Sequence, residues 1–117
     1  EGEIVQCVPL DELAYHVGAK LYKPAAISHF GNYPNSSSIG IELCHPDASG
    51  RFLQSTLDSA IELSAWLCIH FRLHPLSDIW THHGITGKVC PKYFVDHPDA
   101  FDQFRIDVDK TVERSAE

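Results

Sequence analysis

The sequence predicts an α+β fold in which a mixed central β-sheet is flanked by helices. Two observations carry this expectation. Short runs of β-prone residues occur at 4–8, 38–44 and 78–81. Two longer stretches, 52–73 and 98–114, place apolar residues at helical spacing. This order of strands, helices and loops favours a sheet with helices packed on it.

Size and composition indicate one ordinary globular domain. We expect the 117 residues to form a single domain over 1–117. The net charge is −7 and basic residues form no run, so nucleic acid is not an expected partner. No apolar run is long enough to span a membrane, and the acidic Glu1-Gly2-Glu3 does not begin a signal peptide. The chain opens directly on a strand-like segment, as if a hairpin had lost its first strand, which suggests a fragment.

The first half of the chain predicts two strands joined by a long loop. The first strand covers 4–8, and the loop covers 18–37, which is rich in Gly, Pro, Asn and Ser. Loops of this length inside a compact domain are usually functional. The second strand, 38–44, alternates, so one face is apolar and Glu42 lies on the opposite face. The apolar face consists of Ile39, Ile41 and Leu43.

The second half predicts two helices around a short strand. The helix over 52–73 ends before Pro75, because proline cannot continue it. Trp66 is expected in the core on this helix. A strand over 78–81 follows, and a helix over 98–114 closes the chain with Pro98 in its first turn. We expect the long helix to cover the apolar face of the sheet and the Glu42 face to open into a groove.

Four cysteines occur without a CxxC pair, which does not favour a disulfide scaffold. Cys90 stands in a polar loop beside His82 and Lys88. The other three lie in apolar runs and are expected to be buried free thiols, namely Cys7, Cys44 and Cys68.

The loop from Thr81 to Phe94 holds the strongest candidate for chemistry. His82 and Cys90 are residue types that bind zinc through a ring nitrogen and a thiolate. Gly84 and Gly87 allow the loop to fold back, so both side chains could reach one ion. Two ligands do not make a site, however, and an ordinary loop histidine with an ordinary thiol remains the alternative.

Three further residues have a functional and a structural interpretation. Glu42 could be a general base or an edge carboxylate paired with Lys or Arg. Lys88 could stabilise an oxyanion or be a solvated loop cation. His16 could line the groove or be a hydrogen-bonded rim residue.

Two motifs carry a family resemblance. The run His82-His83-Gly84-Ile85-Thr86-Gly87-Lys88-Val89-Cys90-Pro91 resembles the C-terminal motif of zinc-dependent N-acetylmuramoyl-L-alanine amidases. These are the phage-lysozyme type, related to peptidoglycan-recognition proteins. The run 35–43 resembles the family's Asn-x-x-Ser-Ile-Gly-Ile-Glu strand, and 3–6 with 14–16 resembles its opening segment. The resemblance covers essentially the whole chain.

The resemblance implies a peptidoglycan hydrolase that cleaves the amide between N-acetylmuramic acid and L-alanine of the stem peptide. It implies zinc bound by His82 and Cys90, and action on the bacterial cell wall as a secreted autolysin or a phage endolysin. Glu42 would activate water and Lys88 would stabilise the oxyanion. The substrate-binding residues would be His16 and Asn35.

Two departures from the family pattern lower the expected activity. The family's other zinc-binding histidine would lie before Glu1, and Gly84 replaces an acidic residue. We therefore expect an incomplete zinc site, little activity, and a sheet edge through which copies could dimerise. The alternatives are a non-catalytic peptidoglycan-binding module, which typically lacks the thiolate, and a thiol hydrolase that uses Cys90 and His82.

Overall fold

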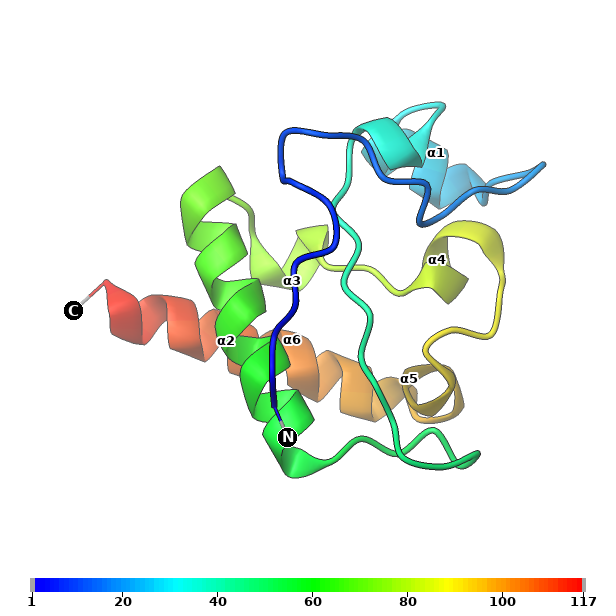
Figure 1. Cartoon of the computed structure of the whole chain (residues 1–117). Helices are drawn as coiled ribbons and strands as arrows, with labels where there is room; N and C mark the ends of the chain where they lie inside the picture. The colour runs from blue at the N-terminus through cyan, green and yellow to red at the C-terminus, as the bar shows by residue number, and fades with distance from the viewer. Residues whose placement is uncertain (1, 117) are drawn as a thin grey trace.

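The computed structural model describes residues 2–116. Two long helices, α2 and α6, cross each other, and the shorter elements follow the irregular chain around them (Figure 1). The elements in order are α1 (Pro24–Phe30), the 3-10 turn η1 (Pro34–Ser36), α2 (Gln54–Phe71), α3 (Pro75–Asp78), α4 (His82–Thr86), α5 (Lys92–Asp96) and α6 (Pro98–Ser115).

The two long helices confirm the predicted helices at 52–73 and 98–114 to within two residues at each end. Helix α2 ends at Arg72, which adopts the left-handed conformation (φ 57°) and donates its N–H to the Cys68 carbonyl. Helix α6 begins with Pro98, whose missing N–H costs nothing in the first turn. Asp99 in the same turn interacts favourably with the positive end of the helix dipole.

The main core lies where α2, α5 and α6 meet. Phe94 of α5 packs its ring within 5.2 Å of the Phe52 and Phe101 rings and 5.4 Å of the Phe104 ring, measured between centroids. These rings meet edge-on or tilted, as aromatic pairs prefer. Val108 of α6 is fully buried beside them. A second, smaller cluster joins α1 to α4 through Val17, Ala26 and Ile85.

The predicted mixed central β-sheet is wrong, because residues 2–116 contain no strand. The segments 4–8 and 38–44 run as irregular chain, and no backbone hydrogen bond of the described residues joins either one to another segment. A helix satisfies its own backbone groups, whereas a strand needs a neighbour at the right distance. Strand propensity in these segments is therefore not sufficient to form a sheet, and the sheet edge expected to support dimerisation is absent with it.

Smaller corrections follow from the same arrangement. The predicted strand at 78–81 is wrong, because Pro75–Asp78 forms the short helix α3. The long loop 18–37 contains α1 and η1. Trp66 is 51% exposed on the outer face of α2, where its ring stacks on His70.

Two of the cysteines expected to be buried are exposed. Cys7 and Cys44 lie in the irregular segments that no sheet covers, so both thiols face solvent. Cys68 lies on the inner face of α2 and is buried as expected, and burial raises the pKa of its thiol.

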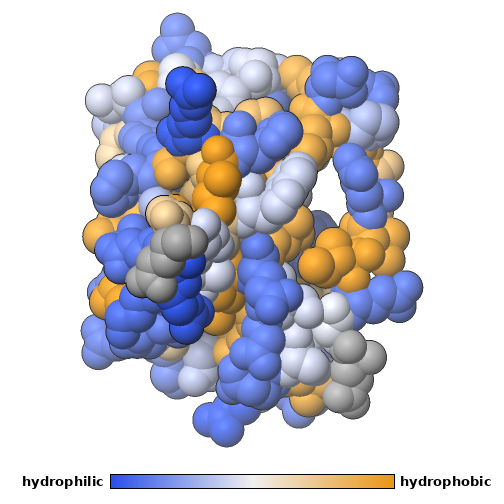
Figure 2. All heavy atoms as spheres, turned by 90° about the vertical axis from the view of Figure 1, so that its left-hand side faces the viewer, coloured by the Kyte–Doolittle hydropathy of each residue, from blue (hydrophilic) through white to orange (hydrophobic). Residues whose placement is uncertain are grey.

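Apolar side chains reach the surface along the irregular segments. Ile4 is 53% exposed and Val5 is 70% exposed. Figure 2 shows hydrophobic patches between hydrophilic side chains on one face of the molecule, together with a hollow. Within residues 2–116, no helix combines the length and apolar character needed to cross a bilayer.

Candidate active site

One large cavity contains most of the residues that the sequence singled out. Its volume is about 1070 Å³, just above the usual range for small-molecule sites. The segment 38–43, helix α2 and the chain from Asp78 to Phe94 contribute to its wall. Five of the six predicted site residues line it, namely His16, Asn35, Glu42, His82 and Cys90. Lys88 does not.

Local hydrogen bonds bring the backbone at His82 and Cys90 together. The Thr81 hydroxyl caps α4 by accepting the Gly84 N–H at 3.0 Å, so His82 becomes the first residue of the helix. Gly87 ends the helix with φ 88°, a conformation that glycine adopts without strain. The chain then turns back, and the His83 N–H donates to the Cys90 carbonyl at 3.1 Å. The predicted fold-back of this loop is thus present.

The neutral form of His82 is favoured by its surroundings. Burial, the Lys88 ammonium group and His16 together hold the pKa of His82 below its ordinary value. Metal binding requires a neutral imidazole, so this environment suits a ligand. It also means that Lys88 and His16 lie close enough to His82 for their charges to act on it.

Glu42 lines the cavity from the irregular segment 38–44 and is exposed to solvent. Among residues 2–116 Glu42 forms no ion pair with Lys or Arg. The alternative interpretation of Glu42 as an edge carboxylate paired with a cation is therefore not supported. Lys88 is exposed, does not line the cavity, and comes directly after the turn at Gly87. Glu42 and His82 thus line the same cavity from different segments, and Lys88 acts on His82 through its charge.

Asn35 is linked to the segment that carries His16 by a hydrogen bond with the backbone of the next residue, Val17. Asn35 is 3% exposed, and its side-chain oxygen accepts the Val17 N–H at 2.8 Å. Its amide nitrogen donates to the Tyr33 hydroxyl at 3.4 Å. Leaving this buried amide without a partner would cost free energy, so its hydrogen bond to Val17 is favoured. Asn35 therefore helps to fix the segment that carries His16.

The donors for a metal are present but incomplete. His82 and Cys90 supply an imidazole nitrogen and a sulfur from one folded loop. A catalytic zinc usually has three protein ligands. Within the described part of the chain, no three His, Cys, Asp or Glu side chains cluster as a metal ion would require.

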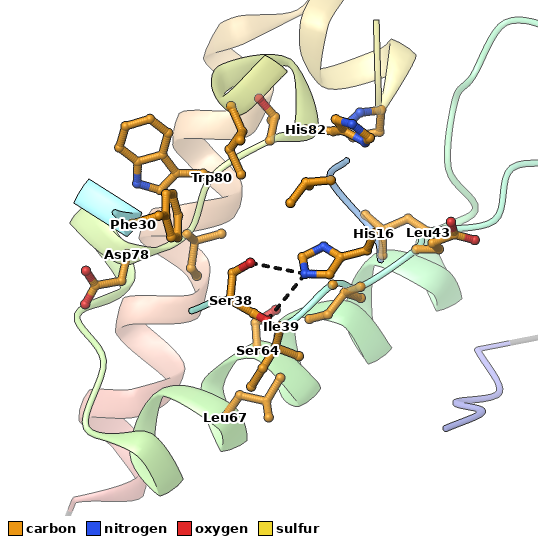
Figure 3. Close-up of a pocket in the computed structure, with 18 of the residues that line it drawn as sticks. His16, Phe30, Ser38, Ile39, Leu43, Ser64, Leu67, Asp78, Trp80 and His82 are labelled. Atoms are coloured by element: carbon orange, nitrogen blue, oxygen red, sulfur yellow. Dashed lines mark hydrogen bonds between the residues drawn. The ribbon is translucent and has the colours of Figure 1, made fainter. Parts of the chain in front are cut away.

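Sequence reasoning missed two features of the cavity wall. The first is the hydrogen bond between Ser38 and His16 (Figure 3). In the sequence, the only sign of this contact is a hydroxyl residue directly before Ile39. His29 of α1 pairs with Asp78 of α3 at 3.0 Å, a contact between residues 49 positions apart that no local pattern reveals.

Comparison with known proteins identifies the family of this chain. The sequence pattern of the N-acetylmuramoyl-L-alanine amidase family matches residues 1–93. This range includes both motifs and all six candidate residues. The chain belongs to the N-acetylmuramoyl-L-alanine amidase family, whose members are generally zinc-dependent.

Individual relatives come from Bacillus. N-acetylmuramoyl-L-alanine amidase BlyA of Bacillus subtilis is 31% identical over 111 residues, covering 90% of this chain and 30% of the relative. N-acetylmuramoyl-L-alanine amidase CwlL of Bacillus licheniformis is 31% identical over 107 residues, covering 92% and 29%. The chain thus spans less than a third of the length of these two relatives. No solved structure matches the chain.

Proposed function

We propose that this chain is an amidase domain that cleaves the bond between N-acetylmuramic acid and the L-alanine of the peptidoglycan stem peptide. The observation that supports the proposal is that His16, Glu42, His82 and Cys90 all line one cavity, in a chain of the amidase family. The site of action would be the bacterial cell wall, and the substrate a muropeptide.

The proposed reaction is hydrolysis with balanced proton transfer. Glu42 takes a proton from the attacking water and returns it to the nitrogen of the departing L-alanine. The bond to the lactyl carbonyl forms from the water oxygen, and the amide C–N bond breaks. Lys88 provides positive charge for the tetrahedral oxyanion. His16 and Asn35 support the substrate at the cavity wall.

His82 and Cys90 are the proposed zinc ligands. Zinc would supply the Lewis acidity that polarises a carbonyl and acidifies water. With two donors among the described residues, we propose weak zinc affinity and slow turnover for this chain.

The zinc assignment has a readout that does not depend on turnover. Alkylation of each cysteine, followed by mass spectrometry, should show zinc slowing the reaction of Cys90. The exposed Cys7 and Cys44 are internal controls and should react equally fast with or without zinc. His82→Ala should abolish the protection. Equal protection in His82→Ala would exclude His82 as a ligand.

Hydrolysis is tested with purified peptidoglycan by labelling newly released L-alanine amino groups. We expect zinc-dependent release, and a loss of about 100- to 10,000-fold in rate for Glu42→Gln, the range for removing a general base. The matched control is Glu62→Gln, an exposed carboxylate on α2, which should leave the rate unchanged.

Two results would contradict the proposal in different ways. Muropeptide binding without any zinc-dependent release would identify a non-catalytic peptidoglycan-binding module. Release that persists with a chelator but is lost in Cys90→Ser would identify a thiol hydrolase.

A further inference from the structure

His16 is held by two contacts from a single residue. Its Nε2 lies 3.3 Å from the Ser38 carbonyl oxygen and 3.1 Å from the Ser38 hydroxyl oxygen (Figure 3). A carbonyl oxygen can only accept a hydrogen bond, so Nε2 must carry the proton in this arrangement. The contact therefore selects one of the two neutral tautomers of the ring.

The Ser38 hydroxyl is oriented by a second acceptor. Its oxygen lies 2.5 Å from the Pro34 carbonyl, which also can only accept. The hydroxyl proton therefore points at Pro34, and the oxygen lone pairs are left for the His16 N–H. Pro34 is fully buried in η1, so this acceptor is fixed in place.

The other ring nitrogen is left as an acceptor. With Nε2 protonated, Nδ1 of a neutral imidazole carries a lone pair. Among residues 2–116, Nδ1 has no hydrogen-bond partner. The ring lies against Gly40, where a Cβ atom would stand 2.7 Å from Nδ1 and 2.6 Å from Cγ. Gly40 thus provides the space that the ring occupies on the cavity wall.

We infer that Ser38 is a positioning residue that holds His16 as the Nε2–H tautomer, so that Nδ1 accepts a hydrogen bond from an amide N–H of the substrate. An acceptor nitrogen selects a donor, and the lactyl–alanine link of a muropeptide offers an N–H at the bond to be cleaved. This substrate assignment rests on the proposed function, whereas the tautomer assignment rests on the geometry alone.

The tautomer is tested by ¹⁵N NMR of the histidine rings, at a pH well above the ordinary histidine pKa. The wild-type chain should show His16 protonated at Nε2 only. Ser38→Ala keeps the carbonyl contact at 3.3 Å and removes the shorter hydroxyl contact at 3.1 Å, so the share of the Nδ1–H tautomer should rise. Ser38→Thr keeps the hydroxyl and should restore the single tautomer. Ser36→Ala is the matched control, because its hydroxyl donates to Tyr33 and not to His16.

The substrate contact is tested by calorimetry with muramyl dipeptide. Ser38→Ala should weaken binding about 5- to 10-fold, the worth of one hydrogen bond, and Ser38→Thr should stay within about twofold. An analogue methylated on the lactyl–alanine nitrogen should bind wild type and Ser38→Ala equally, because it has no N–H to donate. Gly40→Ala should weaken binding by displacing the ring.

The outcomes separate the two assignments. A wild-type His16 protonated at Nδ1, or an unchanged tautomer in Ser38→Ala, would overturn the positioning role. A methylated analogue that still distinguishes wild type from Ser38→Ala would overturn the N–H contact. No binding of muramyl dipeptide by wild type would overturn the proposed function and the substrate contact together, and the NMR result would still decide the role of Ser38.

Discussion

At the residue scale, the pKa of His82 depends on burial, on Lys88 in the same loop and on His16 from a distant segment. Burial has the largest effect on its pKa, followed by Lys88 and then His16, and all three favour the neutral ring. His16 is in turn fixed by Ser38. Side chains from three segments therefore set the chemistry of one imidazole.

Removal of the Lys88 charge should raise the pKa of His82. Lys88→Met deletes a cation that disfavours protonation of the ring, so an NMR titration should place the His82 pKa above the wild-type value. Lys92→Met is the control, because Lys92 pairs with Asp96 at 2.5 Å and should not affect His82. An unchanged His82 pKa in Lys88→Met would contradict the placement of Lys88 beside this ring.

The lowered pKa of His82 also makes the stability of the fold depend on pH in a definite direction. Since folding lowers the pKa of His82, the unfolded chain binds more protons below the ordinary histidine pKa. The contribution of His82 to stability is complete above that pKa and is lost as the pH falls through the lower folded-state value. Lys88→Met should make this loss smaller.

At the element scale, the fold depends on how α5 packs against α6 and against Phe52, just before α2. Phe94 is the contact, since its ring meets Phe52, Phe101 and Phe104 and is 4% exposed. Arg105 of α6 adds a hydrogen bond, in which its Nε donates to the Ile79 carbonyl at 2.8 Å. Both contacts hold α6 against the chain that enters and leaves the candidate active site.

Truncation of the central aromatic ring should destabilise the molecule strongly. Phe94→Ala is expected to lower the free energy of unfolding by about 3–5 kcal/mol, the range for removing a buried aromatic side chain. Urea denaturation followed by circular dichroism measures this loss. Val89→Ala, at a position 61% exposed, should change it by no more than about 0.5 kcal/mol. Similar effects of the two substitutions would mean that Phe94 is not central to the core.

At the scale of the whole molecule, stability is unevenly distributed. The helices α2 and α6 pack on each other and satisfy their own backbone groups. The segments 4–8 and 38–44 have neither helix nor sheet, although the second of them carries Glu42. One side of the cavity is therefore formed by the packed helix α2, and another side by the irregular segment 38–43.

Hydrogen exchange should reveal this division directly. Amides of 4–8 and 38–44 should exchange quickly because no backbone partner protects them, whereas amides in the middle of α2 and α6 should exchange at the rate of global unfolding. Exchange followed by mass spectrometry of peptides measures both. Slow exchange across 38–44 would mean that this segment pairs in solution, contrary to the structure.

The sequence by itself determined the two long helices and the family, and it supplied the candidate site residues. Helical periodicity, Pro98 and the motif around His82 and Cys90 are local features, and a helix closes its hydrogen bonds within a few residues. Only the tertiary structure decided whether the strand-prone segments pair, which charges act on His82, and which residue contacts Nε2 of His16. Each of these depends on groups far apart in the chain, such as Ser38 and His16 or Phe94 and Phe52, and propensity at one position does not specify its partner.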